Sequence, residues 1–519
     1  MAGSDRRDNN CKPGILERLA IPALQAITDR ILVAKTSRPP LRGGGSISLG
    51  QSPNPFNRKL LDEQSLELNQ LLHHAYVVGA TGSGKTYLIL LMVMALIRLG
   101  VGFCVIDVHG DLTQMIVSHL AALMSNPAYR QVVIDRVCLF EPFDTQWALS
   151  FNCLDAIDER RSYLQVSDLL HHFKKEWRDV WGPRMEEIFR NTLLTLSLRG
   201  LTLSDAPRFL TDAQFRRATV AALTDPVLRA YWLERFEPLS DAMKVTAVQP
   251  VLNKITPLID DFYLRHMFSQ PRTQIDFRQA MDQSKWILIN VSKGIAGNNA
   301  HLVGSLFVSR IRTAALSRAD ISEDSRRSFV LLVDEFQNFL NYDFEEILSE
   351  ARKFRLGLVM AHQHLDQLER SMREAIFGNV AATFLFRLGH RDIREIASAF
   401  RDADQPLVRQ ALANLNNGEV VQRDGGGGFR VVKVHRIQKP TASASDIDHL
   451  KGLSHQQYYR RRSEVNAELV ARTATPSVIS VTEGRRTPLS PPPETSVRLI
   501  ERTELTRRPQ ATDIPEGDL

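Results

Sequence analysis

The chain has 519 residues, a net charge of +6 and a pI near 9.1, with 43% hydrophobic and 24% charged residues. This length exceeds what one compact core usually holds and suits two folded units with tails. The balance of apolar and charged residues is ordinary for a soluble globular protein. The four cysteines lie far apart and form no CxxC pair, so we expect neither a zinc site nor a disulfide framework.

The N-terminal segment, residues 1–55, is rich in Pro, Gly and Ser and predicts a partly irregular arm with a short strand at Ile47 to Leu49. Its first residues are charged and are followed by no long apolar stretch, so it does not resemble a signal peptide. The longest apolar run, Tyr87 to Ile106, is long enough to span a membrane. Arg98 and two glycines interrupt this run, which favours a buried helix followed by a buried strand. We therefore expect a cytoplasmic protein.

Residues 56–154 alternate between short apolar runs and helical patterns. They predict strands at Ala75 to Val78, Val101 to Asp107 and Arg136 to Phe140, and a helix at Lys85 to Leu99. Such alternation is typical of a parallel sheet with crossover helices, that is, of an α/β fold.

A glycine-rich loop lies between the first of these strands and the helix. It matches the eight-residue phosphate-loop pattern at every position: Gly79, Ala80, Thr81, Gly82, Ser83, Gly84, Lys85 and Thr86. Glycines let the backbone wrap around phosphate oxygens, and the helix N-terminus adds partial positive charge. Lys85 is expected to reach the β and γ phosphates of ATP, and the Thr86 hydroxyl to bind Mg²⁺. We favour this reading over a chance glycine-rich turn because the whole pattern stands between a strand and a helix.

The alternation of strands and helices then stops. Residues 155–275 show helical spacing only and predict an all-helical insertion. Strand patterns return in residues 276–440, at Trp286 to Val291, Phe329 to Val333, Leu356 to Met360 and Thr383 to Phe386. We therefore expect the helical unit to interrupt the sheet in sequence, and the later strands to complete it.

The C-terminal part contains three further predicted features. Glu419 to Val434 reads as a hairpin that turns at Gly425 to Gly428. Residues 441–472 predict a helical segment. Residues 473–519 are rich in Ser, Thr, Pro and Arg, have few apolar residues to pack, and predict a disordered tail.

Two carboxylates, Asp334 and Glu335, follow the apolar strand Phe329 to Val333. Asp334 is expected to hold Mg²⁺ through water, and Glu335 to accept a proton from the attacking water. An ordinary acidic strand end is the alternative, which the upstream phosphate loop disfavours. Gln363 follows another strand whose end lies at the same sheet edge, where it could orient water against the γ phosphate.

An arginine supplied by a neighbouring subunit can neutralise charge on the transferred phosphoryl group in the transition state. Arg352 and Arg355 lie just before the strand that leads to Gln363, and Arg387, which ends a later strand, is another candidate. The alternative for each is a solvated surface arginine. Asp107, His109 and Asp111 follow another strand, where we expect a structural or supporting role rather than a metal site.

Together these residues resemble the HerA/FtsK superfamily of hexameric motor ATPases, and most closely its conjugative coupling-protein branch of TraG/TraD type. The resemblance covers about residues 45–440 and rests on these stretches: His74 to Val78, Ile106 to Asp111, Phe140 to Pro142, Ser150 to Leu154, Trp181 to Arg184, Val333 to Gln363 and Phe384 to Arg387. The phosphate loop alone is shared by many families. Its combination with a helical insertion, a terminal Asp-Glu and a strand-end Gln is far more specific.

The resemblance implies a RecA-like P-loop core interrupted by an all-helical domain, assembled as a ring of six copies. Nucleotide would lie at subunit interfaces, Arg352 would act on a neighbouring subunit's site, and DNA would pass through the central channel. Coupling proteins usually begin with membrane helices, and no such helix is predicted here. This departure leaves two readings: docking on a membrane-bound secretion component, or a soluble relative that processes DNA or acts in antiphage defence beside a nuclease.

DNA contacts of such a motor would be mainly to phosphates and largely blind to sequence. The insertion offers basic and aromatic candidates, which could equally form the solvated face of an amphipathic helix: Lys174, Lys175, Trp177, Arg178 and Arg184. The run Arg460 to Arg462 has the same two readings. A nucleotide-dependent assembly switch that does not move DNA remains the competing function. A small-molecule kinase is disfavoured, because a kinase needs no water-activating glutamate.

Overall fold

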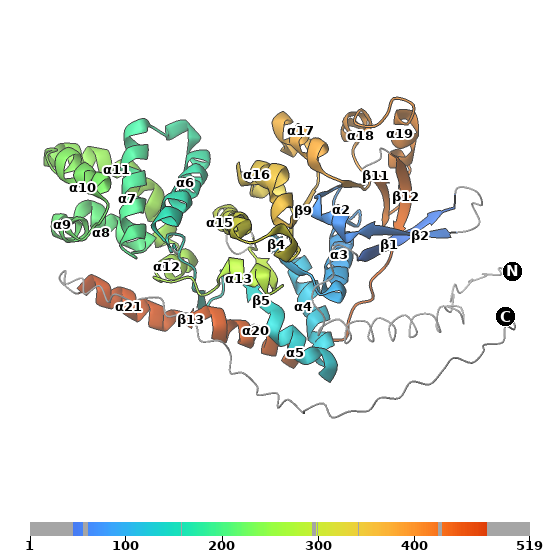
Figure 1. Ribbon diagram of the computed structural model, residues 1–519, viewed down its shortest axis with the longest axis horizontal. Helices are drawn as coiled ribbons and strands as arrows, with labels where there is room; N and C mark the ends of the chain where they lie inside the picture. The colour runs from blue at the N-terminus through green and yellow to red at the C-terminus, as the bar shows by residue number, and fades with distance from the viewer. Residues whose placement is uncertain are drawn as a thin grey trace, which may run out of the picture. The chain divides into compact units, whose positions relative to one another are not determined.

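An eleven-stranded sheet organises the part of the chain that the computed structural model describes, which comprises residues 45–54, 61–156, 158–292, 297, 299–340, 342–423 and 428–474. The spatial order of the strands is β2-β1-β12-β11-β10-β3-β9-β8-β4-β7-β5 (Figure 1). Their bounds are β1 Ser46–Pro53, β2 Leu61–Glu67, β3 Ala75–Val78, β4 Gly102–Asp107, β5 Val137–Phe140, β7 Trp286–Asn290, β8 Phe329–Val333, β9 Leu356–His362, β10 Ala382–Leu385, β11 Glu419–Arg423 and β12 Phe429–Val434.

Seven neighbouring strands, from β10 to β5, pair in parallel. In their register Val78 lies opposite both His362 and Leu385, and Ile106 lies opposite Val333. The carboxyl ends of β3, β9, β8 and β4 therefore meet at one edge of the sheet. This confirms the predicted α/β fold with a mainly parallel sheet.

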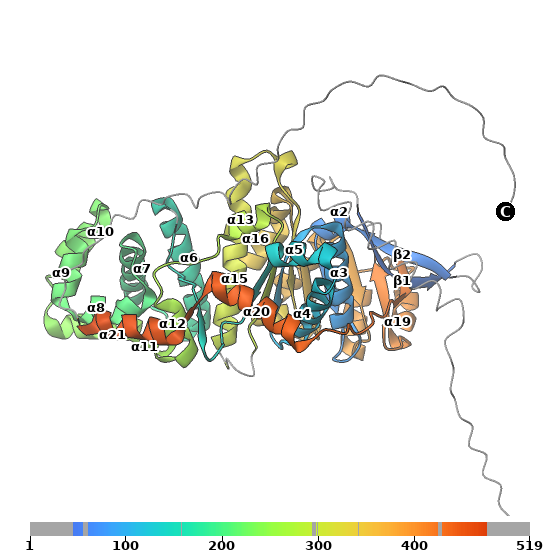
Figure 2. The same ribbon diagram turned by 90° about the horizontal axis from the view of Figure 1, so that it is seen from below.

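Both faces of the parallel region are buried, which is why its strands read as continuous apolar runs rather than alternating ones. Along β3, Tyr76 and Val78 pack into one core, and Ala75 and Val77 pack into the other. Helices α3 (Lys85–Leu99) and α4 (Asp111–Met124) cover the second face, and α15 (Asn299–Leu316), α16 (Tyr342–Glu350) and α17 (Arg370–Asn379) cover the first (Figures 1 and 2). The remaining helices of the sheet region are α2 Leu68–Leu72, α5 Pro127–Arg136, α13 Phe277–Asp282, α18 His390–Ala397 and α19 Gln405–Ala413.

Residues 158–275 contain helices and no strand, in agreement with the helical spacing of this stretch. They are α6 Glu159–Glu176, α7 Pro183–Leu198, α8 Ala206–Thr211, α9 Ala213–Ala221, α10 Pro226–Ala230, a π-helical turn at Tyr231–Phe236, α11 Asp241–Asp260 and α12 Phe262–Phe268. Trp232 is fully buried among them, and its indole N–H donates to the Thr195 hydroxyl at 2.8 Å. Burying an indole requires such a partner for its N–H.

The N-terminal side of the sheet differs from its prediction. The strand expected at Ile47 to Leu49 extends over all of β1, and β2 was not predicted. β1 pairs antiparallel with both β2 and β12, so this part of the predicted arm belongs to the main sheet. The hairpin of β11 and β12 is confirmed, and its predicted turn lies at residues outside the described ranges except for Gly428.

The predicted C-terminal helical segment is interrupted by a strand. It consists of α20 (Ala444–Tyr458), β13 (Tyr459–Arg461) and α21 (Arg462–Ala474). β13 pairs antiparallel with β6 (Trp147–Leu149). In this pairing Leu149 lies opposite Tyr459, which is 310 residues later in the sequence. The predicted disordered tail lies outside the described residues from position 475 onward.

The arginine run around β13 is engaged within the chain. Arg460 pairs with Glu468, the Arg461 guanidinium lies over the Trp147 ring, and Arg462 is buried and donates to the carbonyls of Asp144 and Phe262. These contacts give the run a structural role in attaching the C-terminal helices. The run is therefore not a free basic patch.

The longest apolar run forms α3 and then β4, as expected. In the described ranges, no helix combines the length and the apolar character that crossing a bilayer requires.

Candidate nucleotide-binding site

The phosphate loop, residues 79–86, joins the buried strand β3 to α3. Gly82 and Gly84 have φ angles of 73° and 120°, which side-chain-bearing residues rarely adopt. At Gly79 a Cβ atom would come within 2.4 Å of the Phe386 Cβ, so only glycine fits between the loop and the end of β10. The Ala80 N–H donates to the Arg387 carbonyl at 2.8 Å. The loop is therefore held against the end of β10 by its backbone.

Lys85 opens α3 and is buried beneath the loop. Its Nζ donates to the carbonyl of Gly79 at 2.6 Å and to that of Ala80 at 3.3 Å. Burial lowers the pKa of Lys85, and the carboxylates of Glu335 and Asp334 act in the opposite direction. The ammonium group thus lies between the phosphate loop and the acidic pair. Thr86 is the next residue of α3, so its hydroxyl belongs to the same sheet edge.

Asp334 and Glu335 follow β8, and both side chains are buried. β8 and β3 lie on either side of β9, so the sheet itself brings the acidic pair to the phosphate loop. Burial raises the pKa of Asp334 to about 7, and the neighbouring charges of Asp107 and Glu335 add to this effect. Lys85 only partly offsets it. The Asp334 carboxyl therefore ionises less readily than that of an ordinary aspartate.

Glu335 is held by two amide side chains. Gln363 Nε2 donates to its Oε1 at 2.7 Å, and Gln337 Nε2 donates to its Oε2 at 2.7 Å. The Glu335 backbone is left-handed, with φ of 49° and ψ of 48°, a conformation that is uncommon for a residue with a side chain. The turn directs the chain away from the strand end, while the carboxylate stays between the two amides.

Gln363 connects this carboxylate to the phosphate loop. The Thr81 hydroxyl donates to Gln363 Oε1 at 2.9 Å, so one amide accepts from the loop and donates to Glu335. The structure therefore brings together four of the predicted site residues around the loop: Lys85, Asp334, Glu335 and Gln363. Gln337 was not predicted, because a glutamine two residues after the strand end matches no motif.

Asp107 has a different environment at the end of β4. One carboxylate oxygen accepts from the N–H groups of His109 and Gly110, at 3.0 and 2.9 Å, and the other accepts from Thr113 N–H at 2.8 Å. These bonds satisfy the free N–H groups that open α4. The structural role that we expected for Asp107 agrees with this geometry, although its charge also reaches Asp334.

Arg352 and Arg387 lie at opposite ends of the parallel strands, Arg352 before the start of β9 and Arg387 after the end of β10. The Arg387 carbonyl contacts the phosphate loop, and its side chain is exposed there. Arg352 lies in the short 3-10 turn Ala351–Phe354 before β9. Burial lowers the pKa values of the nearby His73 and His74, and the charge of Arg352 adds to this effect. Seven strand residues span roughly 23 Å, so Arg352 cannot reach the phosphate loop of its own chain. It is exposed and available to a neighbouring molecule.

The donor set fits a magnesium nucleotide. Mg²⁺ prefers oxygen ligands, keeps several waters and is usually shared with substrate phosphates. Asp334 and Thr86 supply suitable oxygens, and Lys85 and the loop N–H groups supply donors for phosphate. Within the described ranges, no group of three or more His, Cys, Asp or Glu side chains could hold a metal by itself.

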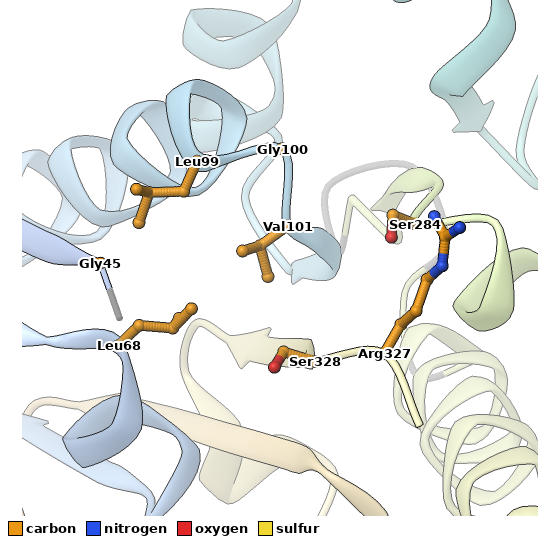
Figure 3. A pocket seen from close by; sticks show the side chains of 8 residues that line it. All are labelled: Gly45, Leu68, Leu99, Gly100, Val101, Ser284, Arg327 and Ser328. Carbon is orange, nitrogen blue, oxygen red and sulfur yellow. The ribbon is translucent and has the colours of Figure 1, made fainter. Parts of the chain in front are cut away.

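A small cavity lies at the other edge of the sheet, where β4, β7 and β8 begin (Figure 3). It is lined by Gly45, Leu68, Leu99, Gly100, Val101, Ser284, Arg327 and Ser328. Its volume of about 20 Å³ is on the order of that needed for a single water molecule. This cavity is too small for a nucleotide and is separated from the phosphate loop by the length of the strands.

Comparisons with known proteins agree with this architecture. A family described as the type IV secretion-system coupling protein DNA-binding domain matches residues 63–466. The plasmid coupling protein TrwB in complex with the GTP analogue GDPNP is similar with a TM-score of 0.53 and 16% identity, over 73% of this chain and 89% of that chain. TrwB with ADP and Mg²⁺ gives a TM-score of 0.52 and 14% identity, over 73% and 88%.

VirB4 of Thermoanaerobacter pseudethanolicus is similar with a TM-score of 0.50 and 13% identity, over 78% of this chain and 99% of that chain. At such low identities these likenesses show a shared fold. None of the curated proteins matches the sequence.

Proposed function

The chain belongs to the family of type IV secretion-system coupling protein DNA-binding domains, and we propose that it is an ATP-hydrolysing motor that moves DNA for transfer. In this proposal six copies form a ring, nucleotide binds between neighbouring copies, and DNA passes through the centre. The expected resemblance to P-loop motor ATPases of the coupling-protein type is confirmed by this membership.

The convergence of Lys85, Glu335 and Gln363 at one sheet edge is the observation that carries the proposal. Nucleotide binding alone needs no base, whereas hydrolysis uses one to accept a proton from the attacking water. Glu335 accepts a hydrogen bond from Gln363, which in turn bonds to the phosphate loop. A phosphate loop without such a base would suit binding alone. The structure therefore supports hydrolysis more than simple nucleotide binding.

We assign roles to the residues as follows. The N–H groups of residues 79–86 and the Lys85 ammonium bind the phosphates. To do so, Lys85 gives up its hydrogen bonds to the carbonyls of Gly79 and Ala80. Glu335 accepts the proton of the attacking water, and Gln363 orients that water. Thr86 and Asp334 would hold Mg²⁺, which would supply positive charge to the phosphates. Arg387 remains a candidate for contact with nucleotide in the same chain, because it follows β10 beside the loop.

Arg352 is proposed to act on the nucleotide of a neighbouring copy. Its position before β9 excludes its own site, and its exposure suits a contact across an interface. An arginine supplied in this way can accelerate phosphoryl transfer by about 10³ or more. Such a role would make hydrolysis depend on contact between neighbouring copies.

DNA is the proposed cargo, as in the DNA-binding family to which the chain belongs. A membrane-bound secretion component is the partner that this role implies, and a nuclease is the partner if the motor instead processes DNA. Contacts to DNA are expected to be with phosphates, so they should weaken steeply as salt rises.

The test is the ATPase rate of the purified protein, measured on a sized oligomer with and without single-stranded and double-stranded DNA. The proposal predicts hydrolysis that DNA stimulates and that Lys85→Ala abolishes. An assembly switch would show the same nucleotide binding with a turnover that ignores DNA. That outcome would replace the motor by the switch.

A further inference from the structure

The chain between Glu335 and Arg352 is short and lies between the site of one copy and the residue proposed to act on the next. We call residues 336–350 the connector; the structure describes its residues 336–340 and 342–350. It contains a 3-10 turn at Phe336–Asn338 and then α16. This segment is the direct covalent connection between Glu335 and Arg352.

The first helix of the insertion, α6, contacts the connector directly. Lys175 Nζ donates a hydrogen bond to the Leu340 carbonyl. One turn earlier, His172 Nε2 lies 3.5 Å from Asp343 Oδ2, and both side chains are buried, with 6% exposed. α6 thus contacts the connector on both sides of the junction between the 3-10 turn and α16.

A buried arginine of α15 joins the same two elements. Arg312 pairs with Asp168 of α6 at 2.5 Å and with Asp343 of the connector at 2.9 Å, and it also contacts Glu346. Burial acts to lower the pKa of Arg312, but the carboxylates of Asp343 and Asp168 outweigh it and raise the pKa. A buried charge with three carboxylate partners fixes their relative positions, because removing any partner is costly.

α15 also holds the first turn of the connector. His301 Nδ1 lies 3.0 Å from the Asn338 carbonyl oxygen, and the Phe339 ring packs so closely on Gly304 that an added Cβ would lie 2.1 Å from it. Gln337, between these contacts and the acidic pair, donates to Glu335. The connector therefore moves as a packed unit with α15 and α6, or it must break these contacts.

We propose that α6 is the element through which the helical insertion and the nucleotide site act on each other, with Lys175 as a positioning residue. A load on the insertion shifts α6, which shifts the connector and thereby Glu335 at one end and Arg352 at the other. In the opposite direction, hydrolysis at the nucleotide site shifts the connector and thereby α6 and the insertion. This inference rests on the proposed function for its link to DNA, whereas the link between nucleotide and α6 stands without it.

The neighbouring lysine provides a matched control. Lys174 Nζ pairs with Glu186 Oε2 at 3.1 Å, and the Trp181 indole N–H donates to the same oxygen at 2.6 Å. Among the described residues, Lys174 therefore pairs within the insertion, while Lys175 contacts the connector. If the two lysines were instead DNA contacts, as their sequence also allows, their substitution should have similar effects on DNA affinity and its salt dependence.

The first experiment compares Lys175→Met, Lys174→Met and Lys175→Arg in the full chain. The measurements are ATPase rate with and without saturating DNA, the Kd for DNA, and the melting temperature. Lys175→Met should lower the stimulation by DNA about fivefold or more at unchanged Kd and melting temperature. Lys174→Met should match the wild type, and Lys175→Arg should restore stimulation. Wild-type stimulation in Lys175→Met, or a loss that follows a weaker Kd, would overturn the proposal.

A second experiment needs no DNA and no turnover. Hydrogen exchange of α6 is measured with and without Mg²⁺ and a non-hydrolysable ATP analogue, in the wild type, Lys175→Met and Asp168→Asn. Nucleotide should change the exchange of α6 in the wild type, and this change should be lost or halved in both variants. Unaltered exchange of α6 in the wild type would contradict the coupling. If DNA fails to stimulate the wild-type ATPase, the motor assignment fails while this experiment still decides the coupling.

Discussion

Gln363 donates a 2.7 Å hydrogen bond from its side-chain amide to the carboxylate of Glu335. The two residues lie 28 positions apart in sequence and follow the neighbouring parallel strands β9 and β8. Because the same amide accepts from Thr81 of the phosphate loop, Gln363 connects the loop to the proposed base through two hydrogen bonds.

Gln363→Ala should lower kcat by about 10²-fold and leave nucleotide affinity nearly unchanged. The substitution removes a donor to Glu335 and a group that can orient water, while the loop and Lys85 remain. The rate and the Kd for Mg-ATP check this result. Thr81→Val is the control, because it removes only the bond from the loop and should cost less. An equal loss in both variants would indicate that loop geometry, and not Gln363, limits the rate.

Glu335→Gln should bind ATP, fail to hydrolyse it and accumulate the bound state. The replacement keeps the size of the side chain but removes the carboxylate that accepts a proton. Rapid-quench measurement of bound ATP and ADP checks this directly. Normal turnover by this variant would mean that another residue is the base.

The raised pKa of Asp334 predicts that the stability of the fold depends on pH in the absence of metal and nucleotide. Its pKa is about 7 in the fold and roughly 3.9 in the unfolded chain. The folded state therefore favours the protonated form, so stability is lost as pH rises from about 4 to 7. The loss is at most roughly 4 kcal/mol. Melting curves at pH 4, 6 and 8 measure it.

The matched variant is Asp334→Asn, which stays neutral at every pH. Near pH 4 its melting temperature should equal that of the wild type, and at pH 8 its melting temperature should be higher than that of the wild type. A difference between the two proteins that does not change with pH would show that Asp334 does not titrate in this range. Binding of Mg-ATP should also release a proton from the wild type below pH 7, and less from the variant.

Arg352→Ala should retain nucleotide and lose turnover, because the missing guanidinium belongs to a site on the neighbouring copy. Mixing it with Glu335→Gln copies should restore part of the activity, since some interfaces then combine an intact base with an intact arginine. The measurement is the ATPase rate against mixing ratio at constant assembly. Assembled mixtures with no activity above either parent would contradict action between copies.

The parallel centre of the fold could be predicted because its strands are buried on both faces. Continuous apolar runs such as Phe329–Val333 and the glycine pattern of the phosphate loop are local signals, and they gave correct element types and positions. The parallel pairing then follows from the alternation of strands with helices, and it places Asp334 near Lys85.

Other features depend on contacts that no local pattern reveals. β2 has mostly polar residues and only Leu66 fully buried, so it is a strand because it pairs with β1. Tyr459–Arg461 lies within a helical pattern and becomes a strand because it pairs with β6. The contact of Lys175 with Leu340 likewise joins the insertion to the sheet region across 165 residues.

Displacement of a triplex-forming oligonucleotide from duplex DNA measures movement along DNA most directly. The oligomeric wild type should displace it only when ATP is hydrolysed, whereas Lys85→Ala and Glu335→Gln should leave it bound. Hydrolysis of ATP by the wild type with the oligonucleotide still in place, or displacement by Glu335→Gln, would contradict a motor driven at this site.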